Sequence, residues 1–328
     1  MRIGFAAPVS GGWAGPAEIA HIARTAERLG YHSLWTYQRL FGAVDGSWGE
    51  AGRSVHDPLI TLAYIAAHTS RIRLGVAVLV MPLYAPAVLA KQLTSLDVLS
   101  AGRLDVGVGN GWADEEFAAA GVSAHGVGRR ADDFLACLHA LWTREIVEHE
   151  GPFYRVPPVR FEPKPVQAPH PPVLLGGNAD AVLRRAGRRC DGWIASGRTD
   201  PASIGRSIAV VRDAAERAGR DPDTLRFVFR APIRLRPDGT GGQSPLGGPA
   251  AKIRDDVAAL ADTGLTEVFL DPNFDPEVGS PDADAEQARD RVELLLDELA
   301  PEPGPAPAHG AAPDHRAAPE HRPKDTPC

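Results

Sequence analysis

The chain has 328 residues, of which 44% are hydrophobic and 23% charged, and its formal net charge at pH 7 is −7. This acidic balance disfavours a nucleic-acid binder, which would present a basic face, and no apolar run approaches the roughly 20 residues that cross a bilayer. The N-terminus starts directly in a strand pattern without signal-peptide architecture, and the three cysteines lie too far apart for a disulfide framework or a zinc site. We therefore expect a cytoplasmic protein.

Strand and helix patterns alternate eight times along the chain. The predicted strands are residues 2–8, 33–37, 72–80, 104–108, 173–175, 192–195, 225–235 and 266–270. The predicted helices are residues 16–29, 57–69, 86–99, 129–142, a helix opened by 176–178, then 201–218, 249–264 and 283–299. Pro16 suits the first position of a helix and Gly30 the left-handed stop after it.

Eight β-α units in about 300 residues predict an α/β fold, a (β/α)₈ TIM barrel, as a single domain over residues 1–300 with loop insertions. The nearly continuous apolar run 72–80 is typical of a parallel strand covered on both faces. A doubly wound open sheet is the alternative, but no nucleotide fingerprint follows the first strand. Residues 41–55 and 150–172 are the expected substrate loops, and the proline-rich second loop is expected to be irregular.

The segment 301–328 differs in composition from the rest of the chain. It contains no Val, Ile, Leu, Met, Phe, Tyr or Trp and is rich in Pro and Ala. Because nothing in it can offset the entropy of ordering by burial, we expect a disordered C-terminal tail. Its histidines, His309, His315 and His321, are expected to be solvated rather than to bind a metal.

A glycine run from Gly107 to Trp112, with the sequence GVGNGW, follows the predicted strand 104–108. Glycine lets the backbone lie against a flat ligand, and α/β proteins bind ligands at the carboxyl ends of their strands. A tight turn without any ligand explains the same spacing about as well. The run alone therefore leaves a binding role and a structural role open.

Four stretches together are more specific than this run. They are LAKQ at 89–92 leading to LDVLSAGR at 96–103, GVGNGW at 107–112 with EEF at 115–117, PKPVQ at 163–167 with PVLLGG at 172–177, and DGW at 191–193. In order and spacing the chain resembles the bacterial luciferase-like monooxygenase superfamily over about residues 1–300. It looks most like the branch of oxidoreductases that depend on the deazaflavin coenzyme F420.

The resemblance implies a barrel that holds a flavin or deazaflavin ring over a bulge at Ala77-Val78-Leu79, with a non-proline cis peptide there. On sequence alone, Ala77 and Val78 are ordinary buried strand residues. The cofactor-binding residues that the resemblance implies are Ala77, Val78, Gly107, Gly109, Asn110, Gly176, Gly177 and Asn178.

A phosphate on the cofactor's side chain needs backbone donors. The helix N-terminus at Gly176-Gly177-Asn178 offers unpaired N–H groups and a partial positive charge. The rival site is Gly247-Gly248-Pro249, because barrels often bind phosphate after strands seven and eight. The family pattern favours the first.

Two positions depart from the family. Gln38-Arg39 stands where many deazaflavin dehydrogenases carry an acid–histidine pair, and Trp112 stands where the sugar-phosphate dehydrogenases place a glutamate. Gln38 and Arg39 can still hold a carbonyl or carboxylate by hydrogen bonds, so they are the candidate catalytic residues. The equipment for oxidising an alcohol is missing.

We therefore expect a coenzyme F420-dependent oxidoreductase that transfers hydride to a C=C or C=N bond of a small organic substrate. The alternative is an FMN-dependent luciferase-like monooxygenase fed by a partner flavin reductase. A metal-dependent hydrolase is disfavoured because no strand end carries metal ligands, and a non-catalytic binding protein is disfavoured because the glycine loops are intact. A homodimer is left open. The aromatic residues expected to line the substrate pocket are Trp13, Phe41, Trp48 and Trp112.

Overall fold

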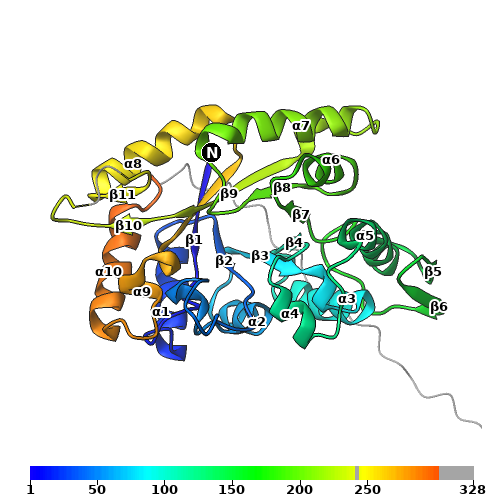
Figure 1. The fold of residues 1–328 in the computed structure, drawn as a ribbon, viewed down its shortest axis with the longest axis horizontal. Helices are drawn as coiled ribbons and strands as arrows, with labels where there is room; N and C mark the ends of the chain where they lie inside the picture. The colour runs from blue at the N-terminus through cyan, green and yellow to red at the C-terminus, as the bar shows by residue number, and fades with distance from the viewer. Residues whose placement is uncertain (241–243, 303–328) are drawn as a thin grey trace, which may run out of the picture.

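Eight parallel strands close into a barrel in the computed structural model, which describes residues 1–240 and 244–302 (Figure 1). Around the barrel they are β1 (Arg2–Ala6), β12 (Glu267–Asp271), β9 (Arg226–Pro232), β8 (Gly192–Ala195), β7 (Val173–Gly176), β4 (Leu104–Gly109), β3 (Arg73–Val80) and β2 (Ser33–Thr36). Since β1 pairs with both β12 and β2, the sheet has no edge. The predicted TIM barrel is confirmed, and the doubly wound alternative is excluded.

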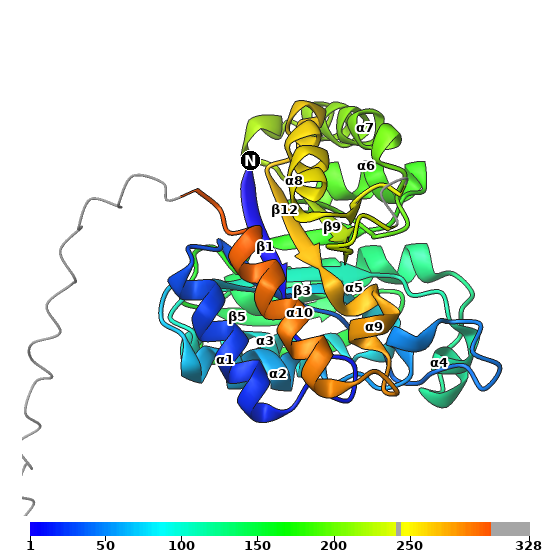
Figure 2. The same ribbon diagram turned by 90° about the vertical axis from the view of Figure 1, so that its left-hand side faces the viewer.

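Helices follow the strands and cover the outside of the barrel (Figures 1 and 2). The helices are α1 (Pro16–Arg28), α2 (Pro58–His68), α3 (Pro86–Leu99), α4 (Asp114–Ala119), α5 (Val127–Thr143), α6 (Asp180–Arg189), α7 (Ile204–Glu216), α8 (Ala250–Ala259), α9 (Pro276–Gly279) and α10 (Ala285–Glu298). Short 3₁₀ turns are η1 (Glu50–Gly52), η2 (Met81–Leu83), η3 (Pro201–Ser203), η4 (Pro222–Thr224), η5 (Leu260–Thr263) and η6 (Pro272–Phe274). The chain from 303 to 328, with the histidines of the predicted tail, lies outside the described residues.

The proline-rich insertion contains regular structure. Strand β5 (Ile146–Glu150) pairs antiparallel with β6 (Arg155–Arg160), so the expectation that 150–172 is irregular is wrong for its first part. Two strands without a third neighbour leave free edges, and proline is tolerated on an edge strand. Asp133 of α5 anchors this hairpin, because its Oδ1 lies 2.7 Å from Nε2 of His149 and its Oδ2 accepts the Phe153 amide at 2.8 Å. Figure 1 shows the hairpin projecting beside α5.

The seventh predicted strand, 225–235, is divided in the structure. Its second part is β10 (Arg234–Leu235), which leaves the barrel and pairs in parallel with β11 (Gly247–Gly248). The division brings the rival phosphate loop, Gly247-Gly248-Pro249, to the carboxyl side of β9, at the start of α8.

The barrel interior has a charged base and an apolar middle. At the amino ends of the strands, Asp105 and Glu267 are buried and both pair with Arg226. Above them Trp35 stacks on Phe269 with ring centroids 5.1 Å apart. Because alternate residues of a strand face inward, this filling leaves only the last inward residue of each strand to shape the carboxyl end of the barrel.

Candidate active site

A bulge in β3 lies at the carboxyl end of the barrel. The pairing of β3 with β4 shifts register between Val76 and Leu79, and the peptide bond between Ala77 and Val78 is cis. Both features agree with what the resemblance implies. Ala77 is buried and Val78 is half-buried, and Val78 packs against the apolar middle of the barrel.

The glycines of the neighbouring strands surround the Val78 side chain. A Cβ at Gly109 would lie 2.7 Å from Cγ2 of Val78, and a Cβ at Gly176 would lie 3.0 Å from its Cγ1. A Cβ at Gly107 would meet the Val76 carbonyl oxygen at 2.1 Å and Val78 Cγ1 at 3.2 Å. Gly107 and Gly109 of the run are therefore required by the bulge, whether or not a ligand binds there.

Replacing Gly109 with alanine is expected to lower the free energy of unfolding by about 1–3 kcal/mol, because the new methyl overlaps a stiff β-branched side chain. The double variant Gly109→Ala with Val78→Ala is expected to lose less than the sum of the two single variants, since it removes the overlapping Cγ2. Urea unfolding of the four proteins measures this coupling.

Gly205→Ala is the matched control, because its Cβ would meet no heavy atom closer than 3.8 Å. It lies on α7 and should leave stability equal or slightly higher, by up to about 1 kcal/mol. Strictly additive losses at Gly109 and Val78 would contradict the overlap.

Asn110, which follows β4, has an unused acceptor. Its Oδ1 is buried and receives no hydrogen bond from the residues that the structure describes. A buried polar atom without a partner costs about 1–3 kcal/mol, so such an atom beside the bulge fits a ligand that donates an N–H.

The glycine pair after β7 leads into an uncapped helix. Gly177 has φ +131, and the N-cap residue of α6, Ala179, makes no side-chain capping bond. Asn178 is exposed, and its Oδ1 accepts a hydrogen bond from Thr199 Oγ1 at 3.1 Å. The first-turn amides of α6 therefore have no side-chain cap, and Gly176-Gly177-Asn178 stays a predicted phosphate site. Helix α8 at the rival loop is also uncapped, with Pro249 as its N-cap, so geometry alone leaves both loops available.

Gln38 is held in place by two hydrogen bonds. Its Nε2 donates to the Tyr84 hydroxyl at 2.8 Å, and its Oε1 accepts the Val80 amide at 2.7 Å. The carboxamide thereby ties the end of β2 to the end of β3, directly after the bulge. Burial raises the pKa of Tyr84 to about 12, so its hydroxyl is protonated at neutral pH.

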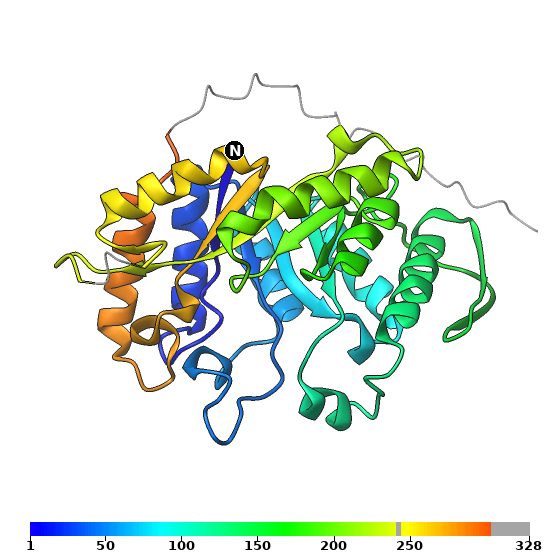
Figure 3. The same cartoon turned by 45° about the horizontal axis from the view of Figure 1, so that its top comes forward.

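Arg39 lies between two indole rings and a carboxylate. Its guanidinium carbon is 4.6 Å from the ring centroid of Trp112 and 5.2 Å from that of Trp48, and its Nη1 is 3.5 Å from Oε1 of Glu116. The same oxygen accepts the amide of Leu40 at 2.8 Å. Figure 3 shows the loop after β2 and helix α4, which carries Glu116, projecting from the same side of the barrel.

An arginine that the sequence analysis missed lies at an inward position near the carboxyl end of β9. The guanidinium of Arg230 is 4.3 Å from the ring centroid of Tyr37 and 4.2 Å from that of Phe274. Its Nε donates to Oδ2 of the fully buried Asp271 at 2.5 Å, and its Nη2 is buried without a partner among the described residues. The available signal was a charged residue in the otherwise apolar run FVFRAP, two positions from the inward Val228.

The aromatic residues predicted to line the pocket separate into two groups. Trp13 is only 3% exposed, and its indole N–H donates to the Val278 carbonyl, so it belongs to the core. Trp48 and Trp112 contact each other edge to face with centroids 5.3 Å apart, and Trp112 is 47% exposed. Phe41, at 47% exposed, lies in the loop after β2.

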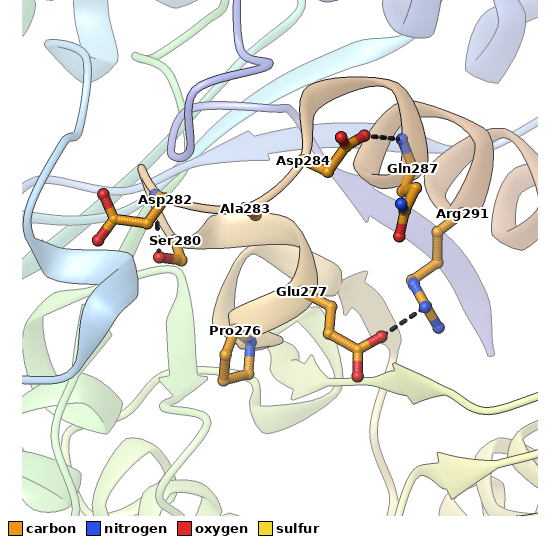
Figure 4. Close-up of a pocket in the computed structure, with 8 residues that line it drawn as sticks. All are labelled: Pro276, Glu277, Ser280, Asp282, Ala283, Asp284, Gln287 and Arg291. Carbon is orange, nitrogen blue, oxygen red and sulfur yellow. Dashed lines mark hydrogen bonds and ion pairs between the residues drawn. The ribbon is translucent and has the colours of Figure 1, made fainter.

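Two cavities of about 320 Å³ lie away from these residues. One is between α9 and the start of α10, where Glu277 pairs with Arg291 and Asp284 caps the helix (Figure 4). The other is on the outer surface between α2 and α3. Tyr84, the hydrogen-bond partner of Gln38, lines the second cavity, but none of the predicted site residues lines either one. The candidate site therefore remains at the carboxyl ends of the strands.

Metal-ligand clusters and membrane-spanning helices were searched across residues 1–240 and 244–302. No group of three or more His, Cys, Asp or Glu side chains there is arranged to hold a metal ion. Within the same ranges no helix has both the length and the apolar character needed to cross a membrane.

Comparisons with known proteins agree on one family. A family model described as luciferase-like monooxygenase matches residues 1–240. An uncharacterised protein of Mycobacterium tuberculosis is 34% identical over 248 residues, which cover 74% of this chain and 76% of that protein. An F420-dependent glucose-6-phosphate dehydrogenase of Nakamurella multipartita is 31% identical, covering 68% of this chain and 65% of its own. An FMNH₂-dependent dimethylsulfone monooxygenase of Pseudomonas putida is 30% identical, covering 54% and 47%.

Solved structures show the same fold. The monooxygenase RslO1 of Streptomyces bottropensis superposes with a TM-score of 0.76 at 25% identity, covering 91% of this chain and 98% of that one. An F420-dependent secondary alcohol dehydrogenase superposes with a TM-score of 0.73 at 16% identity, covering 91% and 98%, and at that identity supports the fold alone.

Proposed function

Because the chain belongs to the luciferase-like monooxygenase family, we propose that it is an oxidoreductase that binds coenzyme F420 and reduces a C=C or C=N bond of a small organic substrate. The relatives that match it include one that depends on F420 and one that depends on FMNH₂. The choice of reduction over alcohol oxidation therefore has to come from the site, and the choice of F420 over FMN rests on the resemblance to the F420-dependent branch.

The observation that carries the proposal is the state of the carboxylates at the carboxyl end of the barrel. Glu116 is paired with Arg39, and Asp271 is paired with Arg230. Burial raises the pKa of Tyr37 to about 12, and its hydroxyl donates to a backbone carbonyl. None of these groups is free to take the hydroxyl proton in alcohol oxidation, a role typically worth about 10²–10⁴ in rate. Reduction needs only one proton, which water can supply.

The residues present fit a flat ring with a phosphate tail. Val78 in its cradle of glycines offers an apolar surface, and the buried Oδ1 of Asn110 offers an acceptor without a partner. The open start of α6 after Gly176-Gly177 offers backbone donors for the phosphate. A bound deazaflavin would supply the hydride, and the protein supplies position and charge.

Within this proposal Arg39 stabilises the negative charge that develops on the acceptor, and Gln38 positions the backbone beside the bulge. Arg39→Ala is expected to lower kcat by about 10- to 100-fold while cofactor affinity changes little, because Arg39 contacts loops after β2 and β4 rather than the glycine cradle. Arg39→Lys keeps the positive charge but loses the planar contact with Trp112. Its kcat should therefore lie between that of the wild type and that of Arg39→Ala.

The test of function is an anaerobic turnover assay with reduced coenzyme F420 and a panel of enones and cyclic imines. The absorbance of the oxidised cofactor measures turnover. Oxidation of the cofactor by an unsaturated substrate without oxygen is the expected result. Activity only in air, or only with reduced FMN, would overturn the proposal and favour the FMN monooxygenase fed by a partner reductase. The 25% identity to the RslO1 monooxygenase supports keeping that second candidate.

A further inference from the structure

Trp112 is flanked by two guanidinium groups from different loops. The Arg39 guanidinium lies 4.6 Å and the Arg198 guanidinium 5.2 Å from the Trp112 ring centroid. Arg39 follows β2, Trp112 follows β4 and Arg198 follows β8, so three loops from the carboxyl end of the barrel meet here. This is the end at which TIM barrels bind their ligands.

The two arginines differ in how their charge is compensated. Arg39 is mostly buried and is paired with the buried Glu116. Arg198 is exposed, and among residues 1–240 and 244–302 its side chain has neither an ion-pair partner nor a hydrogen bond. The cluster Arg39, Glu116 and Arg198 therefore carries one uncompensated positive charge, on a chain whose formal net charge is −7.

Flat apolar surface accompanies this charge. The Trp112 side chain is 47% exposed although two cations and the edge of Trp48 contact it. An indole accepts a second flat group by offset stacking, and a guanidinium binds a carboxylate through two parallel hydrogen bonds. A ligand that is both planar and acidic would use both features at once.

We propose that Arg198 and Trp112 form a subsite for a planar organic acid, an aromatic or α,β-unsaturated carboxylate. Binding of the acid at this subsite needs no cofactor. Only the further step, that this acid is the hydride acceptor, rests on the proposed function. The rival source of a negative charge is the cofactor phosphate, since Thr199, beside Arg198, donates to Asn178 in the predicted phosphate loop.

The probes are cinnamate and its neutral isostere cinnamamide, titrated against tryptophan fluorescence of the cofactor-free protein. The wild type is expected to bind cinnamate about 10- to 100-fold more tightly than cinnamamide, because an ionised carboxylate accepts a stronger hydrogen bond from Arg198 than a neutral amide does. Arg198→Ala should abolish that preference with an unchanged melting temperature. Arg217→Ala is the matched control, because Arg217 is 78% exposed at the C-cap of α7 and, among the described residues, forms an ion pair only with Asp213 one helical turn away.

Equal binding of the two probes by the wild type would overturn the subsite, as would a preference that survives in Arg198→Ala. A second experiment measures how tightly the wild type and Arg198→Ala bind each cofactor, and compares this affinity with that for the cofactor's phosphate-free parent. If Arg198→Ala weakens only the phosphorylated form and leaves the cinnamate preference, Arg198 belongs to the cofactor and the proposal is wrong. A cinnamate preference that requires Arg198, in a protein that reduces no acceptor with coenzyme F420, would support the subsite and refute the proposed function.

Discussion

Replacing Asp105 with asparagine is expected to lower the free energy of unfolding by about 3–5 kcal/mol, the cost of removing one partner from a buried ion pair. Asp105 is fully buried at the base of the barrel. Its Oδ1 is 2.6 Å from Nη2 of Arg73 and 2.5 Å from Nη1 of Arg226, and its Oδ2 accepts a hydrogen bond from each arginine. Asparagine would leave Arg73 without its carboxylate and turn an N–H₂ group towards a cation.

The effect should depend on pH in a defined direction. Burial alone would raise the pKa of Asp105, but hydrogen bonds from Arg73 and the charge of Arg226 outweigh it and hold the pKa below its usual value. A carboxyl whose pKa is lower in the folded state contributes stability above its unfolded pKa of about 4, and loses it as the pH falls towards the folded value. The gap between wild type and Asp105→Asn should therefore be constant from pH 5 to 8 and narrow below pH 4.

Urea unfolding at each pH measures this gap, with Asp213→Asn as the control. Asp213 is half-exposed on α7, and within the part of the chain that the structure describes it forms an ion pair only with Arg217. Its replacement should therefore change stability by less than about 0.5 kcal/mol. A loss at Asp105 as small as the loss at Asp213 would show that the charged base of the barrel is not under strong electrostatic constraint.

Ala179→Asp is expected to weaken binding of a phosphorylated cofactor by about 30- to 100-fold, the equivalent of 2–3 kcal/mol for a charge-assisted hydrogen bond. The new carboxylate would cap α6, occupy its first-turn amides and repel the phosphate. Because aspartate is a favourable N-cap, the same variant should be more stable by about 1 kcal/mol. Lower affinity with higher stability separates this effect from simple misfolding.

Fluorescence titrations compare each cofactor with its phosphate-free parent, which should bind both proteins equally. The same change at the rival helix, Pro249→Asp at the start of α8, is the matched control and is expected to leave the affinity unchanged. If Pro249→Asp weakens the phosphorylated cofactor and Ala179→Asp does not, the phosphate lies at Gly247-Gly248 instead of Gly176-Gly177.

Much of the fold could be predicted because its signals are local. Proline is the first residue of α1, α2 and α3, as the positions of Pro16, Pro58 and Pro86 predict. The apolar run 72–80 is observed as β3 over Arg73–Val80. Such signals act within one turn of helix or along one strand, so they can be read without knowing the neighbours. The hairpin β5–β6 was missed because Pro157 and Pro158 indicate a loop, unless the strand is known to lie on an edge.

The site could be predicted only in part. The resemblance pointed to the bulge at Ala77-Val78, and the structure has it. The resemblance did not reveal that Trp13 is a core residue whose indole N–H donates to the Val278 carbonyl, or that Gln38 connects the ends of two strands by hydrogen bonds. Those partners are 265 and 42 residues away along the chain, and periodicity carries no information on which distant residue a polar atom will meet.

By itself the sequence determined the order of the eight barrel strands and of the main helices between them, the closed parallel architecture and the family. Only the tertiary structure decided what individual residues at the carboxyl end of the barrel do. Gly107, Gly109 and Gly176 lack side chains because Val78 of another strand fills that space, and Arg230 is held by Asp271 from the next strand round the barrel. The physical reason is that barrel closure brings together strand ends that are distant in sequence. Steric fit and charge pairing depend on which residues become neighbours when the barrel closes.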